Sequence, residues 1–164
     1  MSVFDERSAG GLVFRVTEGR VFWLVIKILS KKTIRTSGET VHVTVYKFPK
    51  GHVQDVEVLK QTALREVEEE GRIKSKVINK IGSNDYILWD KETRKKIIKK
   101  VTFFLMEYLG ESELRYNDHE VVLDREWLSF DDALDKLAYE SERTLLKIAA
   151  VRLDTLLKAS KSVK

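Results

Sequence analysis

Three acidic residues gather on the last turns of a helix that we predict over residues 55–70. Glu66, Glu69 and Glu70 stand at positions i, i+3 and i+4, so their carboxylates share one face of that helix. Like charges at this spacing repel, and acidic groups near a helix C-terminus oppose the helix dipole. Sequences often accept such a cost at functional sites. Because hard divalent cations require clustered carboxylates, the pattern indicates a metal site, with a merely solvated acidic face as the alternative.

The residues that precede this cluster favour the metal site. Gly51 is followed by five residues and then Glu57, and seven more residues lead to the segment 65–70, Arg-Glu-Val-Glu-Glu-Glu. This spacing resembles the Nudix box, Gly-x5-Glu-x7-Arg-Glu-U-x-Glu-Glu-x-Gly-U, where U is an aliphatic residue. A chance match is expected about once in ten thousand chains of this composition. One position departs from the pattern, because the closing Gly falls on Arg72 and Gly71 stands one residue earlier. Gly71 is expected to end the helix in the left-handed conformation, one residue early.

The resemblance extends outside the box, over about residues 8–150. The segment 46–53, Tyr-Lys-Phe-Pro-Lys-Gly-His-Val, is similar to a run of bacterial diadenosine polyphosphate hydrolases, and the segments 81–86 and 118–121 also look like that subgroup. The chain thus resembles the Nudix (MutT-like) hydrolase superfamily. The resemblance implies that water attacks a pyrophosphate bond in a nucleoside diphosphate linked to another group X.

The box itself does not choose the group X, because all Nudix hydrolases share it. Dinucleoside polyphosphates such as diadenosine tetraphosphate, cleaved to ATP and AMP, are the substrates that the subgroup motifs favour. Pyrophosphatases for ADP-ribose or nucleoside triphosphates and RNA 5′-pyrophosphohydrolases are the alternatives. A catalytically silent Nudix module that senses nucleotides is an alternative of another class.

The resemblance also implies the metal ligands and their cofactor. Glu69 and Glu70 match the principal metal-binding carboxylates of the family, and Glu66 matches one that binds metal or helps to activate water. The backbone carbonyl of Lys50 is a further expected ligand. The implied cofactor is Mg²⁺ or Mn²⁺. Arg65 is expected to assist catalysis by orienting the glutamates, with a plain surface arginine as the alternative.

Hydrolysis also needs a proton acceptor within reach of the attacking water. Nudix enzymes often take this carboxylate from a loop outside the box, near the late strands. Glu120 is our candidate for the general base. Glu113, Glu111 and Glu66 compete with it for this role.

Candidate substrate contacts lie around the box and on one later strand. Lys50 and His52 flank Gly51 and could contact phosphate, whereas Gly51 itself would let the backbone turn sharply beside the metal. Glu57 is expected to be structural. Tyr86 could stack on an adenine ring, and a tyrosine packed on the sheet is an equal alternative.

These residues must be positioned by a sheet and helices. Apolar β-branched runs predict strands, and apolar residues at spacings of three and four predict helices. In the helix over 55–70, the residues expected on one apolar face are Val56, Leu59, Ala63, Leu64 and Val67. Strands that come first, a helix in the middle and helices at the end indicate an α+β Nudix fold, a mixed β-sheet sandwiched between helices (α/β/α). Strands are expected over residues 9–16, 21–28, 41–46, 73–81, 85–89, 97–108 and 126–128, helices over 55–70, 131–137 and 141–157, and a polar loop over 30–40.

Length and composition set the remaining expectations. The 164 residues predict a single domain, residues 1–164, with a core over about 8–150 and a C-terminal helix reaching about residue 158. The absence of cysteine excludes disulfides, thiolate metal sites and cysteine nucleophiles. The longest apolar run, residues 21–26, is too short to span a bilayer, and no secretory signal is visible. A cytoplasmic protein without a membrane partner is therefore expected.

The charge balance of the chain indicates which kinds of partner it can bind. A net charge of +4 permits binding of nucleotides but is modest for a protein that coats nucleic acid, so no stable nucleic-acid partner is expected. The basic residues within 94–100 could attract a polyphosphate, or they could simply protect a solvated hairpin edge. Monomer and homodimer both remain open.

Overall fold

The structure describes residues 5–114 and 121–162 in this computed structural model. Within these residues one helix interrupts the series of strands, and the last two helices follow all the strands, as the sequence predicts. The elements are β1 (Glu6–Thr17), β2 (Arg20–Thr33), β3 (Thr40–Lys47), β4 (Lys50–His52), α1 (Leu59–Gly71), β5 (Ile73–Asp90), β6 (Lys95–Glu111), β7 (Val122–Leu128), α2 (Phe130–Lys136) and α3 (Glu140–Ser162).

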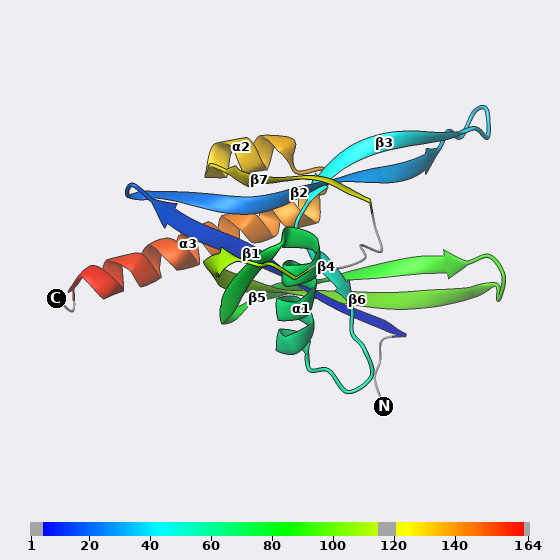
Figure 1. Cartoon of the computed structure of the whole chain (residues 1–164). Helices are drawn as coiled ribbons and strands as arrows, with labels where there is room; N and C mark the ends of the chain where they lie inside the picture. The colour runs from blue at the N-terminus through cyan, green and yellow to red at the C-terminus, as the bar shows by residue number, and fades with distance from the viewer. Residues whose placement is uncertain (1–4, 115–120, 163–164) are drawn as a thin grey trace.

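The strands form one mixed sheet in the order β3-β2-β1-β6-β5, to which β4 adds beside β1 and β7 beside β2. β1 and β6 run parallel, whereas the other strand pairs are antiparallel. Helix α1 covers one face of the sheet, and α2 and α3 lie on the other (Figure 1). The predicted α+β architecture, a mixed sheet between helices, is confirmed. No helix of the described residues is long and apolar enough to cross a membrane.

The central strands are apolar on both faces because each face carries its own core. In β1, Leu12 and Phe14 pack in the core under α3, whereas Ala9 and Val13 pack under α1. Successive side chains of a strand point to opposite faces, so a near-continuous apolar run serves both helices at once. The α3 side of the core also contains the following buried residues of that helix: Leu145, Leu146, Ala149 and Leu153.

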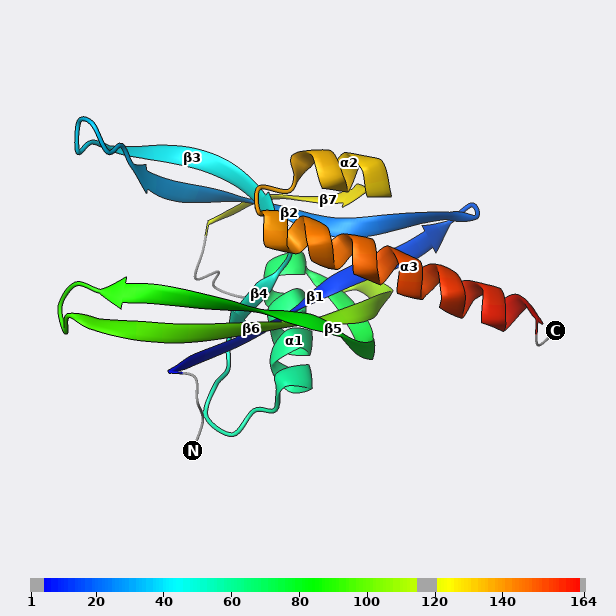
Figure 2. The ribbon, with the colours of Figure 1, turned by 180° about the vertical axis from the view of Figure 1, so that it is seen from behind.

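Two hairpins are longer than the sequence predicts. The polar residues 30–40 were expected to form a loop, but β2 continues to Thr33 and pairs there with Thr40 of β3. The segments 73–81 and 85–89 are one strand, β5, which stays paired with β6 through three register shifts. Ladder hydrogen bonds between backbone groups need no apolar side chains once two strands are aligned. Both hairpins project on the same side of the molecule, away from the C-terminal end of α3 (Figure 2).

Helix α1 begins later than the sequence predicts. Residues 54–57 form a turn instead, in which the Glu57 N–H donates to the Gln54 carbonyl and the Gln54 N–H donates to the Glu57 carboxylate. Such local hydrogen bonds between a side chain and the backbone compete with the first turn of a helix. Val56, expected on the buried helix face, is 96% exposed as a result.

The α3 core should carry much of the stability. We expect Leu146→Ala to lower the free energy of unfolding by about 2–5 kcal/mol, because Leu146 is fully buried and its truncation leaves a cavity. Urea unfolding measures this difference. Val151→Ala, on the same helix but 70% exposed, is the control and should change stability by less than about 0.5 kcal/mol. Equal effects of the two substitutions would contradict this packing.

Candidate active site

The short strand β4 is held between β1 and helix α1. Its residues Lys50, Gly51 and His52 pair with the start of β1 in an antiparallel ladder. On the other side, a Cβ added at Gly51 would overlap the carboxylate of Glu66. A side chain at this position would displace the Glu66 carboxylate from its place beside Arg65. Gly51 does not turn the backbone sharply, as the sequence predicted, but lies in strand β4, where its lack of a side chain leaves room for this carboxylate.

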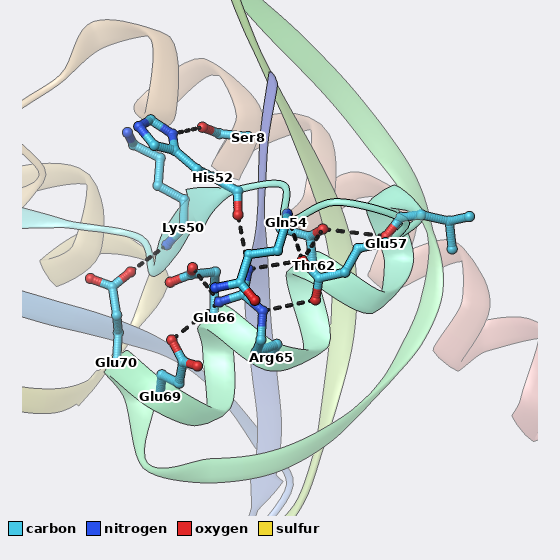
Figure 3. A network of polar contacts seen from close by, with 11 residues as sticks. Ser8, Lys50, His52, Gln54, Glu57, Thr62, Arg65, Glu66, Glu69 and Glu70 are labelled. Carbon is cyan, nitrogen blue, oxygen red and sulfur yellow. Dashed lines mark hydrogen bonds and ion pairs between the residues drawn. The ribbon is translucent and has the colours of Figure 1, made fainter. Parts of the chain in front are cut away.

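Arg65 joins three parts of this region (Figure 3). Its Nε and Nη2 donate to the two carboxylate oxygens of Glu57, at 2.8 and 3.0 Å. Its Nη1 donates to Glu66 at 2.7 Å and to Glu69 at 3.2 Å. Its Nη2 also donates to the backbone carbonyl of His52 at 2.8 Å. These five contacts match the five N–H donors of a guanidinium.

The electrostatics of this network follow from the pairing of Glu57 with Arg65. The guanidinium lowers the pKa of Glu57 to about 2, aided by hydrogen bonds from the Gln54 N–H and the Thr62 hydroxyl. Hydrogen bonds to Glu57 and Glu66 raise the pKa of Arg65 above its ordinary value. The Glu57–Arg65 pair therefore stays charged across the physiological pH range.

The third carboxylate of the cluster contacts β4 directly. Glu70 is 7% exposed, and it accepts a hydrogen bond from the Lys50 N–H at 2.8 Å. Its own backbone carbonyl accepts from Nε of Arg125, on β7, at 2.6 Å. The end of α1 is thus bound to β4 and β7 together.

The end of α1 differs in one detail from the prediction. Gly71 was expected to end the helix in the left-handed conformation, one residue before the family pattern. The structure keeps Gly71 helical and places Arg72 in that conformation, at φ 60° and ψ 33°. A Cβ at Gly71 would come within 2.8 Å of Leu24, so packing selects glycine there. Arg72 consequently takes the left-handed position at which the family has its closing Gly, a conformation that costs roughly 1–2 kcal/mol for a side-chain-bearing residue.

The cluster and β4 enclose one cavity of about 470 Å³. The structure brings together here the predicted residues Lys50, Gly51, His52, Glu66, Glu69 and Glu70. The cavity is also lined by Ser8, whose hydroxyl lies 3.0 Å from Nδ1 of His52. Three lysines complete the polar lining: Lys47, Lys50 and Lys99.

A second cavity, of about 280 Å³, shares those three lysines. Tyr86 and Tyr139 line it together with Glu142, a carboxylate that is 1% exposed and accepts from the Phe48 N–H at 2.8 Å. Tyr86 also lies 3.2 Å from the Ser141 hydroxyl. The two cavities are therefore adjacent, with carboxylates lining one, tyrosines lining the other and three lysines common to both.

Several functional candidates entered only with the structure. Lys47, Lys99, Tyr139 and Glu142 were not proposed as site residues from the sequence. Lys47 directly precedes the Phe-Pro-Lys-Gly segment, residues 48–51, and Lys99 lies in the basic run, so both had a local signal, whereas Tyr139 and Glu142 had none. Glu120, the candidate general base, lies outside the described residues.

The donor set of the first cavity fits a hard divalent cation. Its carboxylates and backbone carbonyl are the oxygen ligands that such ions prefer. The hydrogen bonds described above use one oxygen of Glu66, of Glu69 and of Glu70. In the residues that the structure describes, no three acidic or histidine side chains lie close enough together to hold a metal ion as they stand. A bound ion would therefore draw these carboxylates together.

Comparison with known proteins decides the family. The model of the NUDIX domain matches residues 6–147 of this chain. The chain belongs to the NUDIX domain family. The Nudix resemblance of the sequence is thereby confirmed, and Nudix hydrolases generally use divalent metal ions, in keeping with the donor set of the cavity.

One relative and two solved structures are similar to this NUDIX chain. A protein of Mycobacterium tuberculosis (strain CDC 1551 / Oshkosh), described as "Putative mutator protein MutT4", is 33% identical over 156 residues, which cover 95% of this chain and 59% of that protein. A C. elegans Ap4A hydrolase in a binary complex has a TM-score of 0.64 at 22% identity, over 92% of this chain and 98% of that chain. The NUDIX domain of Shewanella oneidensis NrtR, complexed with ADP ribose, has a TM-score of 0.62 at 15% identity, over 90% of this chain and 87% of that chain. The two structures show a shared fold.

The depressed pKa of Glu57 predicts the pH dependence of stability in this NUDIX domain. The ionised form is favoured in the folded state, so its stabilisation is fully present above the ordinary glutamate pKa of 4.5 and is lost as pH falls towards about 2. We expect Glu57→Gln to lower the melting temperature by about 3–8 °C at neutral pH, because it removes charged hydrogen bonds to Arg65. Calorimetry at decreasing pH should show this difference shrinking below pH 4.5. A difference that stays constant down to pH of about 2 would contradict the pairing.

Proposed function

We propose that this protein is a metal-dependent Nudix pyrophosphohydrolase whose preferred substrates are dinucleoside polyphosphates such as diadenosine tetraphosphate. Hydrolysis of that compound would give ATP and AMP. The observation that carries the proposal is the pair of adjacent cavities, because Lys47, Lys50 and Lys99 line both the carboxylate cavity and the tyrosine cavity. Such a site suits a substrate with several phosphates between the bond that breaks and a nucleoside.

The chain spans 59% of the length of the curated relative that it matches, so neither the activity nor the substrate is carried over from that relative. The proposal rests on the site. Its acidic end would hold the metal, and its lysines offer cationic donors to phosphate oxygens. The ring of Tyr86 or Tyr139 could stack on a base. A C. elegans Ap4A hydrolase with this fold supports the substrate class.

Glu66, Glu69, Glu70 and the Lys50 carbonyl would hold Mg²⁺ or Mn²⁺. A divalent cation bound there would neutralise charge on the phosphates and lower the pKa of water. Arg65 positions Glu66 and Glu69 through its hydrogen bonds. Lys50 has two roles, because its N–H orients Glu70 while its side chain lines the cavity.

The proton of the attacking water needs a carboxylate inside the cavity. Glu66 lines the cavity, so it is a general base that the described residues can supply. Glu111 and Glu113, which the sequence also offers for this role, do not line it. Glu120 stays a prediction from the sequence.

ADP-ribose is the second candidate substrate, because the NUDIX domain of NrtR, with the same fold, is complexed with it. A panel of diadenosine tetraphosphate, ADP-ribose, ATP and a 5′-triphosphate RNA, with Mg²⁺ or Mn²⁺ and chromatographic product analysis, tests the proposal. ATP and AMP from the dinucleotide should dominate. Preference for another compound would reject dinucleoside polyphosphates as the substrate class but would retain pyrophosphate hydrolysis as the reaction. Tight binding without turnover of any compound would reject the enzyme and indicate a sensor.

The metal ligands make a separate prediction. Glu69→Gln and Glu70→Gln should each lower kcat by about a hundredfold or more, because each removes a charged ligand of the cation. Glu68→Gln is the matched control, because Glu68 lies on the same helix but accepts from the Ser112 hydroxyl and does not line the cavity. Steady-state kinetics with circular dichroism would separate lost activity from lost fold. Unchanged kcat in both variants would end the assignment of these ligands.

The tyrosine cavity leads to a further prediction, about substrate binding. Tyr86→Ala should raise KM for the dinucleotide by about tenfold with a smaller change in kcat, because stacking on a base contributes about 1–3 kcal/mol to binding. Tyr86→Phe, which keeps the ring and loses the contact with the Ser141 hydroxyl, is the control. If Tyr86→Ala leaves KM unchanged, the aromatic cavity does not bind the base.

A further inference from the structure

The positive charge of the chain is concentrated on the two projecting hairpins. Residues 27–47 hold five Lys or Arg and one Glu, and residues 85–100 hold six Lys or Arg and three acidic residues. These segments therefore carry +4 and +3, whereas the whole chain carries +4. The rest of the molecule must be negative by 3. Lys47 and Lys99 line the active-site cavities, so without them the two segments carry +3 and +2. A modest overall charge thus hides an uneven distribution of charge.

Apolar side chains accompany this charge on the β5–β6 hairpin. Trp89 is 60% exposed and Ile87 is 71% exposed. In the antiparallel register, Trp89 lies opposite Lys96, and Ile87 lies opposite Ile98. Directly opposed residues of an antiparallel pair point to the same face. One face of the hairpin therefore carries a tryptophan, two isoleucines and a lysine, next to a turn that adds further cations.

The cations at the tip of the β5–β6 hairpin have no acidic partner in the described part of the molecule. No ion pair joins Lys91, Arg94, Lys95 or Lys96 to an acidic side chain, although Asp90 lies beside them. The Asp90 carboxylate accepts instead from the backbone N–H groups of Glu92 and Thr93 in the turn. The cationic groups are thus available to an external anion.

Protection of a sheet edge does not account for this surface. Lysines do protect exposed edges from pairing, but large apolar side chains on the same edge increase the tendency to pair. A tryptophan exposed between cations is instead typical of surfaces that stack bases and neutralise phosphates of a single strand.

A membrane surface fits less well than a polynucleotide. Insertion into a bilayer needs apolar groups at the tip of a hairpin, where this hairpin has the charged and polar turn Asp90-Lys91-Glu92-Thr93-Arg94. The exposed apolar residues lie behind this turn. The charge also extends over a second hairpin, β2–β3, that projects on the same side (Figures 1 and 2). A long flexible polyanion can contact both hairpins.

We propose that the β5–β6 hairpin binds single-stranded nucleic acid, with Trp89 stacking on a base and with Lys95, Lys96 and the cations of the turn contacting phosphates. This binding is independent of hydrolysis, because Trp89, Lys95 and Lys96 line neither cavity of the active site. It also departs from the expectation, drawn from the net charge, of no stable nucleic-acid partner.

Binding of a dye-labelled oligouridylate with a 5′-hydroxyl tests the proposal without involving pyrophosphate chemistry. We expect fluorescence anisotropy to show binding at about 50 mM salt that weakens at least tenfold by about 200 mM, through counterion release. Trp89→Ala should weaken binding by about tenfold, because one base–aromatic stack is lost. Trp89→Phe should retain most of the affinity.

Charge-matched variants separate a local surface from a general effect of net charge. The double substitution Lys95→Ser/Lys96→Ser should weaken binding and reduce its salt dependence. Lys147→Ser/Lys161→Ser, which removes the same charge from α3, should change neither. Quenching of tryptophan emission by unlabelled oligouridylate should disappear in Trp89→Ala, because Trp23 is 1% exposed and Trp127 packs against Tyr108.

Three results would overturn the proposal. The first is no binding of oligouridylate at about 50 mM salt and about 100 µM protein. The second is an equal loss of affinity in the two double variants. The third is binding to phosphatidylserine vesicles, abolished by Trp89→Ala, under conditions in which oligouridylate does not bind. Circular dichroism of every variant, together with hydrolysis of the best small substrate, would confirm that the fold and the active site are intact.

Discussion

The guanidinium of Arg65 is the group on which the arrangement of the site depends. The three carboxylates of the α1 cluster repel one another, and on a bare helix they would separate. Arg65 binds Glu66 and Glu69 from the same helix and also holds Glu57 and the His52 carbonyl. It therefore turns a repulsive cluster into a fixed one and attaches it to β4. Hydrogen bonds between charged partners that are largely shielded from water are stronger than those of an exposed ion pair.

Close backbone packing supplies the second constraint. Gly51 lies against the Glu66 carboxylate, and Gly10 lies against the Pro49 carbonyl, with no room for a Cβ at either position. Residues 49–51 are therefore packed closely between β1 and helix α1. The buried Glu142 of α3 adds a hydrogen bond to the Phe48 N–H from the opposite layer. Elements from both faces of the sheet therefore determine where the backbone of residues 48–51 lies, and with it where the lysines of the site lie.

Local patterns predicted most elements but misplaced their ends. The period of the apolar residues identified strands and helices because burial is what that period measures. It failed at residues 30–40, where cross-strand hydrogen bonding extends a hairpin through polar residues. It also failed at Val56, where hydrogen bonds between Gln54 and Glu57 form a turn in place of a first helical turn. In each place backbone hydrogen bonding, which leaves no trace in hydropathy, decided the outcome.

The sequence by itself determined the family, the acidic cluster and the residues around Gly51, because these lie close together along the chain and the spacing of a helix brings the carboxylates to one face. Only the tertiary structure decided what lies opposite the cluster. Lys99 and Glu142 come from distant parts of the chain, and their place depends on strand register and helix docking. The same holds for the charge of the hairpins. A count of charges gives their sum, whereas the fold decides that the cations project together on one side.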